Sequence, residues 1–232
     1  MKYRIEHHSN QACPDELFGR LVYNGNRFDW DACLCFNNKP LNRACIKVTT
    51  KVTKKTRVID TLGLADSTIP FIVLVLESPH ISEFDQNGKA IGPAQGKTGA
   101  GINLNLPKVL TRSKSIIGVN GFKEKYNVYI VNAVNKQCSL GLKPICKTIR
   151  DINFAVEWFK NSKSDGLKQR LSNILATNGN DQNNIILNLC TKGGFLPLQD
   201  FVDNLLKQSF YNVIQAKGYH PSSSRFAGCI LK

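Results

Sequence analysis

The sequence predicts an α/β protein, a three-layer α/β/α sandwich around a four-stranded parallel sheet. Short apolar runs of strand length recur after residue 70, and segments with helical periodicity separate them. Strands that alternate with amphipathic helices favour a parallel sheet with both faces covered. With 232 residues, of which 42% are hydrophobic, the chain is long and apolar enough for a sizeable core.

The four predicted strands are apolar runs that lead into polar residues. They are 71–76, 126–131, 184–189 and 211–215. Such runs are typical of parallel strands that are buried on both faces. Glu77, Asn132 and His220 follow three of them. Because parallel strands end at one edge of the sheet, we expect a carboxylate, an amide and an imidazole to meet in one crevice there.

Four predicted helices carry apolar residues at helical spacing. They are 102–110, 149–159, 167–175 and 198–206. Pro107 is expected to delay or kink the first, because proline lacks an amide proton. Thr148 and Asp151 have the spacing of a capping box, which predicts the start of the second. In the less regular N-terminal part, the apolar spacing suggests a helix over 14–22.

Charge is distributed unevenly along the chain. The net charge is +14, from 31 basic and 17 acidic residues. The segments 39–58, 86–123, 125–150 and 204–232 contain basic but no acidic side chains. Because an ordinary soluble surface mixes both signs, these segments indicate a polyanionic partner, and nucleic acid is the usual one. General basicity for solubility is the alternative.

The cysteines and the N-terminus point to a reducing compartment. Eight cysteines are scattered without any C-x-x-C pair, and the N-terminus has no apolar signal core. We therefore expect a cytoplasmic protein with reduced thiols. No apolar run reaches the ~18 residues of a membrane helix, so we expect no membrane association.

The polar segments after the strands resemble the motifs of the uracil-DNA glycosylase superfamily. LESPH (76–80) stands where that family has a first motif such as G-Q-D-P-Y-H or G-E-A-P-G. PAQGKTG (93–99) resembles the P-F-V-G-R-A-G loop of the iron–sulfur branch. IVN (130–132) resembles the end of its middle strand, and HPS (220–222) its last motif. All four occur in the family's order, over about 71–226 of the chain.

The resemblance implies that the chain hydrolyses the N-glycosidic bond of a base flipped out of DNA. Asn132 would recognise the base edge, and His220 would stabilise the departing anionic base. Glu77 would position water and stabilise the cationic sugar. Arg225 and Phe226 would enter the groove and fill the gap. Because no lysine is placed as a Schiff-base nucleophile, we expect a monofunctional enzyme that leaves an abasic site.

The resemblance also assigns the remaining site residues. The predicted catalytic residues are Glu77, His220 and Ser78. The predicted substrate-binding residues are Asn132, His80, Pro79, Ala94 and Gln95. The predicted DNA-binding residues are Lys97, Thr98, Ser222, Ser223, Ser224 and Arg225. Residues 66–232 would form the catalytic domain and 1–65 a basic extension packed on it. We expect a monomer with DNA as its partner and no metal or other cofactor.

Three departures from the family's motifs bear on the substrate. The water-activating Asp falls at Ser78, the Tyr that screens the base falls at His80, and the stacking aromatic falls at Ala94. Small residues widen a pocket, so the resemblance favours a base larger than uracil. A 5-modified cytosine, such as the glucosylated hydroxymethylcytosine of phage DNA, would fit, and the enzyme would then act in antiviral defence. Stacking by Phe84 or Phe122 would instead keep plain uracil, and DNA repair, as the alternative.

Other interpretations remain open. A non-catalytic DNA-binding module on the same fold is the first, and a hydrolase of small nucleosides or nucleotides is the second. Gly96-Lys97-Thr98 also suggests a phosphate-binding loop, but Ile91 stands where its first glycine is needed. The cysteines near 138–146 and 13–45 suggest an iron–sulfur cluster, with spacings that differ from those of the family.

Overall fold

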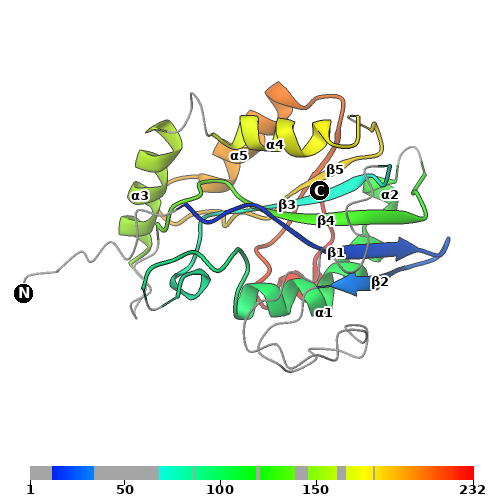
Figure 1. The fold of residues 1–232 in the computed structure, drawn as a ribbon, viewed down its shortest axis with the longest axis horizontal. Helices are drawn as coiled ribbons and strands as arrows, with labels where there is room; N and C mark the ends of the chain where they lie inside the picture. The colour runs from blue at the N-terminus through cyan, green and yellow to red at the C-terminus, as the bar shows by residue number, and fades with distance from the viewer. Residues whose placement is uncertain are drawn as a thin grey trace, which may run out of the picture.

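A single mixed sheet of six strands, with helices on both faces, forms the framework of the protein (Figure 1). The computed structural model describes residues 12–33, 68–85, 87–118, 121–138, 146–160, 166–179 and 181–232. The predicted α/β class is confirmed. The prediction of a four-stranded, purely parallel sheet is wrong, because two antiparallel strands extend the sheet at one side.

The strand order is β2-β1-β4-β3-β5-β6. The strands are β1 (Glu16–Tyr23), β2 (Phe28–Cys33), β3 (Phe71–Leu76), β4 (Lys125–Asn132), β5 (Ile185–Asn188) and β6 (Ile214–Lys217). β3 pairs in parallel with β4 and with β5, and β5 pairs in parallel with β6. The four predicted parallel strands are thus present, and β6 begins three residues later than predicted.

β3 is the central strand, and its side chains build both halves of the core. All six of its residues are buried. Ile72, Leu74 and Leu76 face the half that α1 (Lys97–Arg112) covers. Val73 and Val75 face the half that α3 (Lys147–Lys160), α4 (Leu167–Ala176) and α5 (Leu198–Ser209) cover. A strand with two buried faces needs a continuous apolar run, which is why it could be recognised in the sequence.

The helix predicted over 14–22 is wrong, because this segment is strand β1. Its pairing register shifts between Leu17 and Gly19 on one side and between Arg20 and Leu21 on the other. Such bulges break the period-two alternation of a strand, so consecutive residues become buried. The resulting apolar spacing resembles that of a helix.

The helices divide between the two faces of the sheet. In Figure 1, α4 and α5 lie above the sheet and α1 lies below it. Short helices complete the described elements: α2 (Lys114–Ile117) and two 3-10 turns, Ile81–Glu83 and Phe226–Gly228. The four helices predicted after residue 100 are present, with α1 beginning at Lys97, earlier than expected. None of the helices in the described ranges is both long and apolar enough to span a membrane.

Pro107 lies inside α1 without ending it. A proline in a helix leaves the carbonyl four residues earlier without its usual amide donor, which here is the carbonyl of Asn103. The indole nitrogen of Trp30, in β2, donates a hydrogen bond of 2.8 Å to that carbonyl. Trp30 of the edge strand β2 therefore gives the Asn103 carbonyl a donor in place of the missing one. The same hydrogen bond connects the β1–β2 hairpin to α1.

Part of the predicted N-terminal extension belongs to the main sheet. β1 and β2 lie within residues 1–65, and β1 pairs with β4. Residues 1–11 and 34–67 lie outside the described part of the chain. The domain boundary near residue 65 therefore stays a prediction.

Phe226, predicted to enter the DNA groove, is fully buried in the core beneath α1. Its burial leads to a prediction about stability. Phe226→Ala should lower the free energy of unfolding by about 3–5 kcal/mol, the usual cost of truncating a buried phenylalanine. Urea denaturation measures this change. The matched control is Tyr211→Ala, since Tyr211 is 86% exposed, and it should cost less than about 0.5 kcal/mol. Equal costs for the two variants would contradict the packing of Phe226.

Candidate functional site

The topology places a crevice at the carboxyl ends of β3 and β5. β4 follows β3 in the chain and lies on one side of it, whereas β6 follows β5 and lies on the opposite side. The connections therefore diverge between these two central strands. In open α/β sheets, ligands bind at this kind of switch point, outside the carboxyl ends of the strands. Glu77 follows β3 here, and Thr191 lies in the loop after β5.

Glu77 is a buried carboxylate with two polar partners. Its exposed fraction is 5%. The Thr191 hydroxyl donates a hydrogen bond to Oε2, and the Arg150 Nε lies 3.3 Å from Oε1. Burial raises the pKa of Glu77, while the Arg150 charge and the Thr191 hydrogen bond oppose that rise. The Ser78 side chain contributes a further hydrogen bond that lowers the pKa.

Asp151 connects this carboxylate to the loop 191–197. Arg150 Nη2 lies 2.6 Å from Asp151 Oδ1. Asp151 Oδ2 accepts hydrogen bonds from the backbone N–H groups of Gly194, Phe195 and Leu196, at 2.7, 2.6 and 3.1 Å. Burial alone would raise the pKa of Asp151, but these donors and Arg150 hold it below the ordinary value. The predicted capping role of Asp151 is therefore wrong: its side chain holds a distant loop.

His220 presents a neutral imidazole at the same edge. Desolvation lowers its pKa to about 4, and the Arg150 charge adds to the lowering. The backbone N–H of Ser222 donates to His220 Nδ1 at 3.3 Å, and the Ser222 hydroxyl lies 2.9 Å from the same nitrogen. Because Nδ1 accepts, the proton of the neutral ring belongs on Nε2. His220 can therefore offer an N–H donor to a ligand without carrying a charge.

Asn132 belongs to a second cluster, around Glu83. Its Nδ2 donates to Glu83 Oε2 at 3.3 Å, and the Ala94 N–H donates to Glu83 Oε1 at 3.0 Å. The Cys13 Sγ lies 3.7 Å from the same Oε2. Burial raises the pKa of Glu83 to about 7. Ala94 adopts φ 56°, which is unusual for a residue with a side chain and indicates local strain.

The two clusters project from opposite faces of the sheet. Asn132 pairs with Leu76 in the parallel register, so both side chains face α1. Glu77, the next residue, instead contacts Arg150 of α3, on the other face. Within the described chain, Asn132 forms no hydrogen bond to Glu77 or His220, and its Oδ1 has no partner. The structure thus places Glu77 against Arg150 and Thr191, and Asn132 and Ala94 together around Glu83. His220 is linked to Arg150 through the effect of that charge on its pKa.

The other predicted residues line the surrounding loops. His80 is exposed and Pro79 is buried. The Gln95 Nε2 donates to nearby loop carbonyls, at 3.3 and 3.4 Å. Lys97 and Thr98 begin α1, which is separated from β3 by the 3-10 turn 81–83 and a loop, unlike a phosphate-binding loop that follows its strand directly.

The serine-rich loop after His220 is mainly exposed. Ser222, Ser224 and Arg225 are exposed and Ser223 is partly buried. Arg225 lies 5.7 Å from the centre of the Tyr219 ring. This loop is accessible to a ligand, as its predicted role in DNA binding requires.

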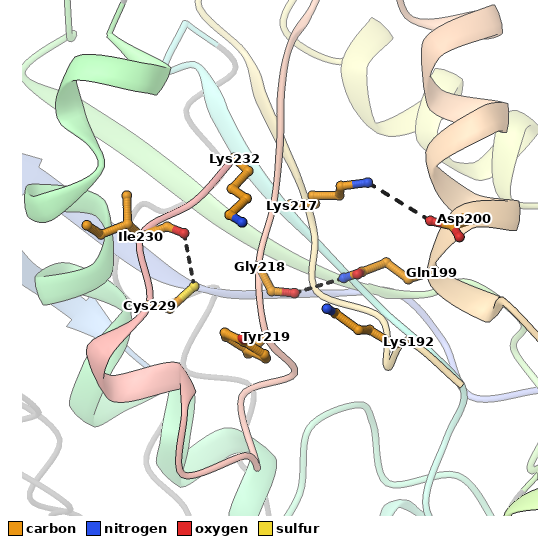
Figure 2. A pocket seen from close by; sticks show the side chains of 9 residues that line it. All are labelled: Lys192, Gln199, Asp200, Lys217, Gly218, Tyr219, Cys229, Ile230 and Lys232. Atoms are coloured by element: carbon orange, nitrogen blue, oxygen red, sulfur yellow. Dashed lines mark hydrogen bonds and ion pairs between the residues drawn. The ribbon is translucent and has the colours of Figure 1, made fainter. Parts of the chain in front are cut away.

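A cationic pocket of about 280 Å³ is lined in part by Tyr219, the residue before His220 in the chain (Figure 2). Lys192, Lys217 and Lys232 line it from three separate segments. The Lys217 Nζ lies 3.1 Å from Asp203 Oδ2, whereas the other two lysines have no carboxylate partner within the described ranges. The Lys192 Nζ lies 5.8 Å from the centre of the Tyr219 ring. Sequence reasoning missed this pocket, because no motif links its segments.

The described residues offer no group of three or more His, Cys, Asp or Glu side chains placed to hold a metal. Cys13, Cys138, Cys146, Cys190 and Cys229 are free thiols. Burial raises the pKa of Cys138 to about 12 and that of Cys190 well above its ordinary value, so neither is a ready thiolate. Cys35 and Cys45 lie outside the described ranges, so the expectation about a cluster stays a prediction.

Comparisons with protein-family models, with curated proteins and with solved structures gave no match. Functional inference for this chain therefore depends on its own residues and geometry.

The raised pKa of Glu83 predicts a pH effect on stability. Between pH 4.5 and about 7, the unfolded chain releases a proton that native Glu83 retains, so stability falls as the pH rises through this window. The loss is on the order of 3 kcal/mol and levels off above that window. Urea denaturation across this range should show it. Glu83→Gln, which cannot ionise, is the control and should lack this component; parallel pH curves for both proteins would contradict the prediction.

Proposed function

We propose that the chain is a monofunctional DNA N-glycosylase, which removes a flipped base and leaves an abasic site. The observation that carries the proposal is the buried Glu77–Arg150 pair at the switch point of the sheet, together with the effect of the Arg150 charge on the pKa of His220. One group can carry negative charge, and the other is a neutral hydrogen-bond donor. This combination suits a reaction that separates charge between sugar and base.

The proposed chemistry assigns each group a step. The electron pair of the N-glycosidic bond leaves with the base, and the His220 Nε2–H stabilises the resulting anion. Glu77 stabilises the positive charge on the sugar. It then accepts a proton from the water whose oxygen bonds to C1′. Arg150 and Thr191 support this role, because they oppose the protonation of Glu77 that burial favours.

The charge of the molecule supports DNA as the substrate. The net charge is +14, and Lys192 and Lys232 line a pocket next to the His220 loop. Lysines that lack carboxylate partners are available to phosphate groups, which supply most of the affinity of proteins for DNA. A small-molecule hydrolase would not require this surface.

Neither aromatic candidate for stacking on uracil is available, which supports a bulky base as the substrate. Phe84 is buried, and Phe122 packs with Tyr23, Phe28 and Tyr126. Neither aromatic ring is free to stack on a base in place of the missing aromatic at Ala94. We therefore propose a 5-modified pyrimidine, such as glucosylated hydroxymethylcytosine, as the substrate base, with a role in antiviral defence.

A non-catalytic DNA-binding module is the second candidate. Glu77 is only 5% exposed and its oxygens already have partners in Thr191 and Arg150, an arrangement that also suits a structural ion pair. Asn132, the proposed base reader, lies in the other cluster. These observations make a direct test of base release necessary.

The test measures abasic sites in DNA that contains uracil, hydroxymethylcytosine or its glucosylated form. We expect release of the bulky base, with a loss of about 10²-fold or more for His220→Ala, the usual cost of removing one transition-state donor. Glu77→Gln keeps the shape of the side chain and should lose about 10²–10⁴-fold. Tyr211→Ala should retain full activity. Salt-sensitive DNA binding without any base release would favour the binding module instead, and release of uracil alone would refute the bulky substrate.

A further inference from the structure

Phe195 is an exposed aromatic residue beside the candidate site. Its exposed fraction is 63%, and it lies in the loop between β5 and α5. A large apolar side chain on a loop next to a ligand-binding edge is a candidate contact residue. Neither the sequence motifs nor the proposed chemistry assigns it a role.

Several contacts hold the backbone of the loop that carries Phe195. Three successive backbone N–H groups, from Gly194 to Leu196, donate to the buried Asp151 carboxylate. Gly193 has φ 85°, and a side chain there would lie 1.8 Å from the carbonyl oxygen of Leu196. Only glycine fits this turn. The ring is therefore presented from a fixed backbone, so little conformational entropy is lost when it binds a partner.

The same contacts connect Phe195 to the candidate catalytic group. Thr191, at the start of the loop, bonds to Glu77. Arg150 pairs with both Glu77 and Asp151. The Phe195 backbone is thus held by the network that positions Glu77, and a nucleotide above Glu77 would have its neighbours near this loop.

The surroundings of Phe195 are cationic. Lys192 lies in the same loop and is exposed. A side chain at Gly194 would lie 3.1 Å from the Lys147 Cδ, so that lysine also borders the loop. The charge of Asp151 is matched by Arg150 and three backbone donors. An exposed aromatic ring on a loop that contains one lysine and borders another fits stacked bases between phosphates better than it fits an apolar protein surface.

We propose that Phe195 inserts into the DNA duplex and occupies the space that the flipped nucleotide leaves. The proposal rests on the proposed function and adds to it the residue that opens the duplex. Phe226, expected in this role from its position after the last motif, is buried in the core.

The first experiment compares duplex and single-stranded substrates. Only a duplex needs opening, so Phe195→Ala should lower the ratio of the duplex rate to the single-strand rate by about 10- to 100-fold, the usual effect of losing one stacking contact. Phe195→Trp should restore the ratio. Phe159→Ala is the matched control, since Phe159 is 67% exposed and lies at the far end of α3, and its ratio should equal that of the wild type. An unchanged ratio for Phe195→Ala overturns the proposal.

A second measurement separates this proposal from the proposed function. The fluorescence of 2-aminopurine, placed beside the target base in a duplex, rises when the neighbouring base leaves the stack. In the His220→Ala background, which removes chemistry, the rise should disappear on adding Phe195→Ala. Failure of the wild type to release any base refutes the glycosylase, and the fluorescence still decides whether Phe195 opens the duplex. Self-association that Phe195→Ala abolishes, with unchanged fluorescence, would assign the ring to a protein contact and overturn the proposal.

Discussion

The Arg150 guanidinium organises the carboxyl edge of the sheet. It pairs with Glu77 at 3.3 Å and with Asp151 at 2.6 Å, and its charge lowers the pKa of His220. A buried carboxylate without a partner costs several kcal/mol. The Arg150 charge therefore opposes protonation of the Glu77 carboxyl group and also of the His220 imidazole. Burial favours the neutral form of both groups, and Arg150 opposes this at Glu77 while reinforcing it at His220.

How much of the fold and of the candidate site could be predicted depends on whether the contacts involved are local or distant in the sequence. β3 was predictable because both of its faces are buried, which requires an uninterrupted apolar run. β1 was not, because its bulges hide the alternation. The role of Asp151 was not predictable either: its partners lie 43 to 45 residues later in the chain, and nothing local indicates the contact. The residues around Glu83 in the sequence likewise give no sign that its side chain bonds to Asn132, 49 residues later.

The position of Asn132 illustrates a second limit. The sequence correctly indicates that polar residues follow the strands at one edge of the sheet. It does not indicate on which of the two faces of the sheet each side chain lies. In a parallel pair, residues in register share a face, and Asn132 is in register with Leu76 rather than with Glu77. A shift of one residue changes the face. For the proposed enzyme, a base would have to lie across the edge to reach both clusters, so the separation of the two carboxylates constrains its orientation.

The glycine-rich start of α1 also acquires a structural explanation. A side chain at Gly101 would lie 2.1 Å from the carbonyl oxygen of Pro221. The backbone of the last motif therefore rests directly on the helix, which only a glycine permits. Since Pro221 follows His220, this contact fixes the imidazole relative to the sheet. The start of α1, which suggested phosphate binding, thus has a packing role at Gly101. Through this contact α1 positions His220, more than a hundred residues later in the chain.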